Sequence, residues 1–238
     1  GFMASADTYS MSMTQNKDSS SEIRLTSAAD SQINWMVGAS YTSIEARLVG
    51  YNVLWGGTPR PTQSVSTFDP ETRAVFASLG YDISDTLTLN LELRKQDDKV
   101  IEGTLGNEPL SNTFSSTTPR VILDYKPREG LTYYAIFAKG VNPGQFNAGL
   151  LGRTQGELDQ IAAQGGGGIS VDEEEITNIE FGTKARFWDD RAQITAAVYF
   201  SDWENAIAPE ILSITNAAGD GENIQVNSNG GQADLSGL

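Results

Sequence analysis

The chain has 238 residues, 39% of them apolar and 20% charged, and its formal charge is −15 with an isoelectric point near 4.3. Because affinity for nucleic acid comes from lysine and arginine displacing counterions from phosphates, so acidic a chain is not expected to bind nucleic acid. Cysteine and histidine are absent, which excludes the usual zinc ligands, cysteine nucleophiles and histidine bases, and no cofactor is expected.

Alternation of apolar and polar residues with a period of two runs along most of the chain. In 87–94 a leucine at every second position alternates with a polar residue. This pattern predicts strands with one apolar face, about ten in all. The clearest are expected at 23–26, 33–41, 73–83, 87–94, 120–126, 131–137, 178–187 and 194–200.

The connections between these strands alternate between short and long. Tight turns are expected at 29–32, 84–86, 127–130 and 188–191, because each is rich in turn-forming residues. Long connections are expected at about 44–71, 98–117, 140–175 and 205–221. In an antiparallel sheet this order places all tight turns at one rim and all long loops at the other. It is the layout of an up-and-down transmembrane β-barrel, with short periplasmic turns and long extracellular loops.

Six aromatic residues lie near the ends of the expected strands and are candidates for the membrane interface, where aromatic rings gather in barrels. Ordinary packing in a sheet remains the alternative, since strands favour aromatic residues anyway. The six are Tyr41, Tyr81, Tyr125, Tyr133, Phe187 and Trp188.

The connection 140–175 is expected to contain a short helix. Thr154 and Glu157 have the spacing of a capping box, and Leu158, Ile161 and Ala162 form an apolar stripe after it. The glycine run 165–168 is expected to end the helix and to be flexible. The acidic run 171–175 is interpreted as a solvated barrel rim, with a cation site as the alternative.

Five segments, in one order along the chain, resemble the barrel of TonB-dependent outer-membrane receptors. They carry the sequences SEIRLTS followed by NWMVGASY, TPRVILDYKP, LTYYAIFAKG followed by NPGQFN, the strand pair at 175–186 and 192–203, and VNSNGGQA. One departure is Val141-Asn142, where the family usually has an aromatic and a basic residue. The segments are 21–41, 118–127, 131–147, 175–203 and 226–233.

The resemblance implies that residues 1–238 are part of a single β-barrel domain, with less than half of a barrel of about 22 strands. The chain is expected to be an internal piece of a longer protein, with the plug domain and the segment that engages TonB outside it. The implied function is uptake of a scarce nutrient across the bacterial outer membrane, most commonly a ferric siderophore. The implied partners are outer-membrane lipid, TonB and a small-molecule cargo.

Four residues stand where an expected strand meets the longest loop, so they are candidates for contact with cargo: Lys139, Gln145, Phe146 and Asn147. A purely structural role at the rim is the alternative. No enzyme is expected, because the paired acids Asp97-Asp98 would point to opposite faces of a strand and Asp189-Asp190 lie in a turn. A passive porin-type channel and a soluble or surface all-β binding module, such as a lectin or adhesin, remain the alternative functions.

Overall fold

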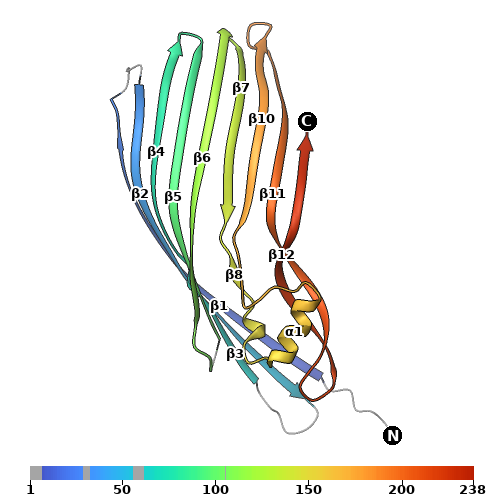
Figure 1. Ribbon diagram of the computed structural model, residues 1–238. Coiled ribbons are helices and arrows are strands. Elements are labelled where there is room, and N and C mark those ends of the chain that lie inside the picture. The colour runs from blue at the N-terminus through green and yellow to red at the C-terminus, as the bar shows by residue number, and fades with distance from the viewer. Residues whose placement is uncertain (1–6, 29–32, 56–61, 105) are drawn as a thin grey trace.

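The computed structural model describes residues 7–28, 33–55, 62–104 and 106–238. Ten strands form one antiparallel sheet that curves along its length (Figure 1). Its strands are β1 (Asp7–Thr26), β2 (Ile33–Trp55), β3 (Thr62–Phe68), β4 (Glu71–Ser84), β5 (Leu87–Thr104), β6 (Leu110–Arg128), β7 (Leu131–Asn142), β10 (Glu174–Phe187), β11 (Ala192–Thr215) and β12 (Gly221–Gly237). Strands that follow one another in the sheet are paired, except that β3 and β4 do not pair with each other. Each of these two pairs with β2 on one side and with β5 on the other, at different heights along the long strands. The expected antiparallel all-β fold is confirmed.

The two faces of the sheet differ along rows that cross seven strands. One row is apolar from end to end, and six of its seven side chains are 38–54% exposed. Its members, paired strand by strand, are Trp35, Leu79, Leu91, Val121, Phe137, Ile179 and Phe200. The row one residue further, on the opposite face, is mostly polar: Met36, Ser78, Glu92, Arg120, Ala138, Asn178 and Ser201. An exposed apolar face opposite a polar one is the arrangement of a barrel that faces lipid outside and water inside.

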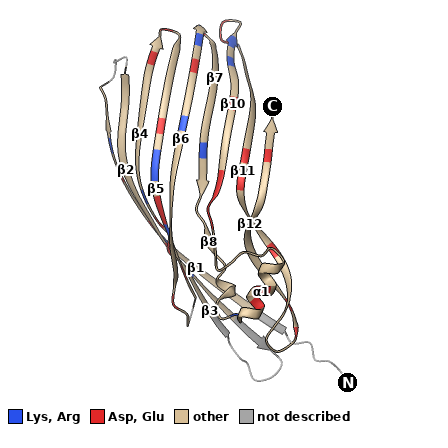
Figure 2. Ribbon diagram, in the orientation of Figure 1, with Lys and Arg blue, Asp and Glu red and all other residues tan. Residues whose placement is uncertain are grey.

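The apolar outer face has a limited height. Counting from the tight turns, the first outward charges are Arg73 in β4, Lys95 in β5 and Lys139 in β7. The intervening segments, such as 87–95 and 131–139, match the roughly 9–11 residues that a tilted strand needs to cross a bilayer. The outer face therefore carries a membrane-sized band that ends at these charged positions. Figure 2 shows where charged residues of either face lie along the strands.

Three of the four expected long loops are mostly strand, so that prediction was wrong. β5 extends to Thr104, and β6 already begins at Leu110. In the same way β11 extends to Thr215, and β12 begins at Gly221. β2 likewise continues to Trp55, so Tyr41 lies within that strand and not at its end. The tight turns at 84–86, 127–130 and 188–191 are confirmed, while 29–32 lies outside the described residues.

The remaining long connection, between β7 and β10, holds the non-sheet elements. They are β8 (Gln145–Phe146), the 3₁₀ turn η1 (Ala148–Leu150), α1 (Gln155–Ala163) and β9 (Ser170–Val171). The predicted helix is confirmed with its capping box: the Thr154 N–H donates to the Glu157 carboxylate at 2.7 Å, and the Glu157 N–H donates to Thr154 Oγ1 at 3.4 Å. No helix in the described part of the chain is long and apolar enough to cross a membrane.

Candidate functional site

The connection 143–173 packs across the β11–β12 hairpin beyond the membrane band. It covers an apolar cluster whose members are each less than a tenth exposed, with Leu158 packed beside them. The cluster comprises Leu150, Ile161, Leu212, Ile214, Ile224 and Val226. Of the three residues in the predicted apolar stripe of the helix, Ile161 is buried and Leu158 is partly buried, whereas Ala162 is exposed. Loop and hairpin form one packed unit at the rim (Figure 1).

Side chains of α1 satisfy the free edge of β11. Gln160 acts like a strand residue, since its Oε1 accepts from the Thr215 N–H at 2.8 Å and its Nε2 donates to the Thr215 carbonyl at 3.1 Å. Gln164 Nε2 donates to the Ser213 carbonyl at 3.1 Å. Backbone groups on an open edge invite pairing with other chains, so these glutamines protect the edge as well as fixing the helix.

Asn147 ties the base of the loop to β12. It is 6% exposed. Its Nδ2 donates to the Gly168 carbonyl at 2.7 Å and to the Asn227 carbonyl at 2.9 Å, and its Oδ1 accepts from the Asn227 N–H at 2.8 Å. The side chain therefore closes the loop on itself and joins it to a strand far along the chain.

The other three candidates for cargo contact lie around this base. Phe146 is buried against Val100 and Phe114, and Gln145 pairs with Val171 between β8 and β9. Lys139 forms an ion pair with Glu175 on the neighbouring strand β10. The structure thus gives all four residues structural contacts, and cargo contact at any of them stays a prediction.

Within the glycine run 165–168, which follows the end of α1, Gly166 and Gly167 are closely packed, and the flexibility of the run stays a prediction. A Cβ at Gly166 would meet the Leu212 and Ile161 side chains, and one at Gly167 would meet the Asn227 carbonyl. These glycines are needed because the backbone approaches the hairpin too closely for any side chain.

An ionic clamp holds the start of α1 to β12. The Arg153 guanidinium donates to both carboxylate oxygens of Glu222, at 2.8 and 2.6 Å, and lies 3.5 Å from Glu157. The hydrogen bond from Arg153 lowers the pKa of Glu222. Hydrogen bonds from the backbone and side chain of Thr154 lower the pKa of Glu157.

We expect this clamp to weaken in acid. A carboxyl whose pKa is lowered by folding stabilises the fold above its unfolded pKa, about 4.3, and that stability is lost as the pH falls through the lower folded value. Hydrogen exchange at the α1 amides, corrected for intrinsic rates, should show protection falling below about pH 4. Glu222→Gln should remove part of this pH dependence, and an identical profile in both proteins would contradict the clamp. The comparison is needed because burial raises the pKa of Glu173 in the same loop, which acts in the opposite direction.

Two carboxylates of the acidic run 171–175 are engaged in protein contacts. Glu174 accepts from Asn142 Nδ2 at 2.8 Å and from the Ile207 N–H at 2.9 Å, and Glu175 pairs with Lys139. Among the described residues there is no cluster of three acidic side chains arranged to hold a metal ion.

A charged hollow of about 410 Å³ lies on the polar face of the sheet, which would line the barrel interior. Arg24 and Arg94 both lie 5.9 Å from the centre of the Phe76 ring, and Arg120 lies 3.6 Å from Glu92. The sequence showed Glu92 and Arg94 only as the polar half of an alternating strand. Their convergence with Arg24 depends on the pairing of β1, β2, β4 and β5 and gave no signal in the sequence.

The candidate interface aromatics lie at two levels. At the tight-turn rim, Tyr125 and Tyr133 stack with ring centres 6.4 Å apart, and Phe187 meets Trp188 edge to face at 5.1 Å. Tyr81 lies near the same rim, and Tyr41, paired in register with Arg73, lies at the opposite limit of the apolar band. Five of the six rings thus gather near the tight turns, as in an aromatic girdle, and their role in the membrane stays a prediction.

Comparison with known proteins gives one family and a consistent set of folds. The family described as "TonB dependent receptor-like, beta-barrel" matches residues 2–238. No curated protein sequence matches the chain. The ferric yersiniabactin uptake receptor FyuA from Yersinia pestis is similar over 98% of this chain and 33% of its own, with a TM-score of 0.65 and 16% identity.

Two further solved structures have the same fold. The siderophore receptor PiuA from Acinetobacter baumannii has a TM-score of 0.64 at 15% identity, over 94% of this chain and 35% of its own. The copper transporter OprC has a TM-score of 0.65 at 16% identity, over the same shares of the two chains. The chain therefore spans about a third of the length of these proteins.

Proposed function

The chain belongs to the TonB-dependent receptor β-barrel family, and we propose that the receptor containing it imports a ferric siderophore across the bacterial outer membrane. Proteins of this family reside in the outer membrane and are not enzymes. The observation that carries the proposal is the pair of rows across seven strands, apolar on one face and polar on the other. It provides a wall between lipid and a wet interior, and the packed loop unit at one rim provides a surface for capture.

Siderophore receptors recur among the similar structures, with cargoes that include yersiniabactin, pyoverdine and alcaligin. A bare metal ion is a second candidate cargo, because the copper transporter OprC is equally similar. Copper sites favour cysteine, methionine and histidine, and this chain has four methionines but no cysteine or histidine. A siderophore arrives with its iron already chelated and needs no such ligands, and the recurrence of siderophore receptors among the similar structures supports the first candidate.

We further propose that a plug domain elsewhere in the same receptor fills the barrel and engages TonB. The charged hollow around Arg24, Glu92 and Arg94 supports this, because these side chains face the side of the sheet on which a plug would lie. The barrel wall, the rim and the plug would then act together, and no bond in the cargo would change.

The experiment is uptake of radioactive iron by cells that carry or lack the full-length receptor gene, supplied with a panel of ferric siderophores under iron limitation. Uptake of at least one siderophore should fall to background in the deletion strain and in a strain without TonB, and plasmid-borne receptor should restore it. Undiminished uptake of every siderophore would refute the proposal. A loss of copper uptake alone would favour the second candidate.

A further inference from the structure

A notch interrupts the hydrogen-bonded wall on the side of the long connections. β7 ends at Asn142 and β10 begins at Glu174. On either side of them pairing continues, to Leu110 in the β5–β6 hairpin and to Thr215 in the β11–β12 hairpin. No strand of the described sheet lies between these two rim hairpins, so backbone pairing does not hold them together. The rim hairpins comprise 98–104 with 106–114, and 205–229.

The connection 143–173 occupies the notch and contacts both rim hairpins. On the side of β5 and β6, Phe146 is 8% exposed and is buried against Val100 and Phe114. Gly144 approaches the same hairpin so closely that a Cβ there would lie 2.5 Å from the Phe114 ring. This apolar contact is the first anchor of the connection.

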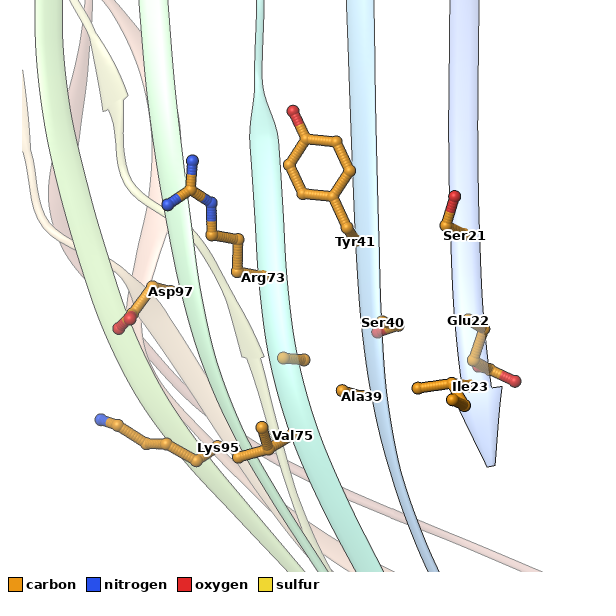
Figure 3. A pocket seen from close by; sticks show the side chains of 11 residues that line it. Ser21, Glu22, Ile23, Ala39, Ser40, Tyr41, Arg73, Val75, Lys95 and Asp97 are labelled. Atoms are coloured by element: carbon orange, nitrogen blue, oxygen red, sulfur yellow. The ribbon is translucent and has the colours of Figure 1, made fainter. Parts of the chain in front are cut away.

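The first anchor lies on the interior side of the barrel wall. Lys95 and Asp97 of β5 line a groove on the outer face of the sheet (Figure 3). Val100 follows Asp97 by an odd number of residues in an unbroken register, so its side chain points to the opposite face. The connection therefore bridges the notch from inside, where it borders the space through which cargo would enter.

Two asparagines and an apolar cluster form the second anchor, on β11 and β12. Asn147 bonds both backbone groups of Asn227. Asn229 reaches the other end of the connection in the same way: its Oδ1 accepts from the Asp172 N–H at 2.7 Å, and its Nδ2 donates to the Asp172 carbonyl at 2.9 Å. Between these bonds α1 packs on the apolar cluster of the hairpin. Both ends of the connection are thus tied to β12.

The connection is stiff between its two anchors. Its two legs pair as β8 and β9, and the Asn147 N–H donates to the Ile169 carbonyl at 2.8 Å. The capping box and the Arg153 clamp fix the start of α1. One rim hairpin can therefore move relative to the other only if the buried contact at Phe146 or the asparagine bonds on β12 break.

We propose that the connection 143–173 is a fixed strut that holds the two rim hairpins as one body, so that this part of the rim is preformed and does not close on cargo. A cargo can shift a conformational equilibrium only by binding one of its states better. The strut disfavours every state in which the hairpins have moved, because each such state loses a buried contact. A preformed surface spares cargo binding the cost of ordering the rim. The statement about cargo rests on the proposed function, whereas the strut itself does not.

The test is the distance between nitroxide labels on the two hairpin tips, measured by double electron–electron resonance on the full-length receptor in detergent. The labels are attached through Glu108→Cys and Ala218→Cys, at exposed residues of the tips. This chain has no cysteine of its own, and any cysteine elsewhere in the receptor is replaced by serine. The cargo-free receptor should give one narrow distance distribution. Adding the ferric siderophore that the receptor takes up in the transport experiment should leave that distribution in place.

Phe146→Ala should replace the narrow distribution by a broad one, because the substitution removes the anchor on β5 and β6. The matched control is Ile169→Ala, which removes an apolar side chain from the same connection at a residue that is 37% exposed. The Ile169 carbonyl and its bond to Asn147 remain in this variant, so the narrow distribution should be kept.

Four results would overturn the proposal: a broad distribution in the cargo-free receptor, no broadening in Phe146→Ala, equal broadening in Ile169→Ala, or a shift when the siderophore binds. The first and the last need no substitution in the connection, so they decide even where a variant fails to fold. If no siderophore is taken up by any strain, the proposed cargo fails, while the cargo-free distances still decide on the strut.

Discussion

Replacing Leu91 with arginine is expected to lower sharply the fraction of receptor that folds into a membrane, whereas arginine at Asn90 is expected to be tolerated. Leu91 lies in the middle of the apolar row and is 38% exposed on the outer face. Arginine on the lipid face of a barrel costs about 2–4 kcal/mol at the bilayer midplane. Asn90 points to the other face, where its Nδ2 lies 3.5 Å from an Asp124 carboxylate oxygen, so a cation there meets an acid and water.

The measurement is refolding of the full-length receptor into lipid vesicles, followed by the shift in gel mobility between unboiled and boiled barrel protein. Leu91→Arg should lower the folded fraction sharply, and Asn90→Arg should match the wild type. The two changes add the same charge to adjacent residues, so general effects of arginine are controlled. Equal folding of both variants would mean that the apolar row does not face lipid, and a soluble sheet would then be the better account.

The membrane-spanning part of the fold was predictable from sequence because lipid and water act on opposite faces of each strand. That difference imposes the alternation seen in 87–94, and the tight turns follow from their composition. Beyond the band no lipid faces the strands, so the contrast between lipid and water ends there. The extensions of β5, β6, β11 and β12 were taken for loops, although backbone pairing continues along them and Leu212, Ile214, Ile224 and Val226 pack against the connection 143–173.

The loop unit was predictable only where its signals are local. The helix was found because Thr154 and Glu157 are three residues apart and bond each other. The contacts of three other side chains were not predictable, because their partners lie on a hairpin much later in the chain. These contacts join Gln160 to Thr215, Arg153 to Glu222 and Asn147 to Asn227. The close packing of the glycines at 166 and 167 was not predictable for the same reason, because the hairpin that their backbone approaches lies much later in the chain.

Asn147→Ala is expected to open the loop unit even when no cargo is present. The change removes the partner of the Gly168 carbonyl and of both backbone groups of Asn227. Each buried group left unpaired costs about 1–3 kcal/mol, so the local cost is several times that of a surface substitution. Hydrogen exchange across 143–173 in the cargo-free receptor should therefore speed up strongly.

The matched control is Asn142→Ala, at an exposed asparagine whose Nδ2 donates to Glu174 at 2.8 Å. Water can replace that bond, so exchange in the loop should change little. The comparison also separates the two roles considered for Asn147. If the residue served only to contact cargo, its loss would weaken binding but leave exchange in the cargo-free receptor unchanged. If it closes the loop, exchange rises first, and any loss of binding follows because the rim surface is no longer held in place.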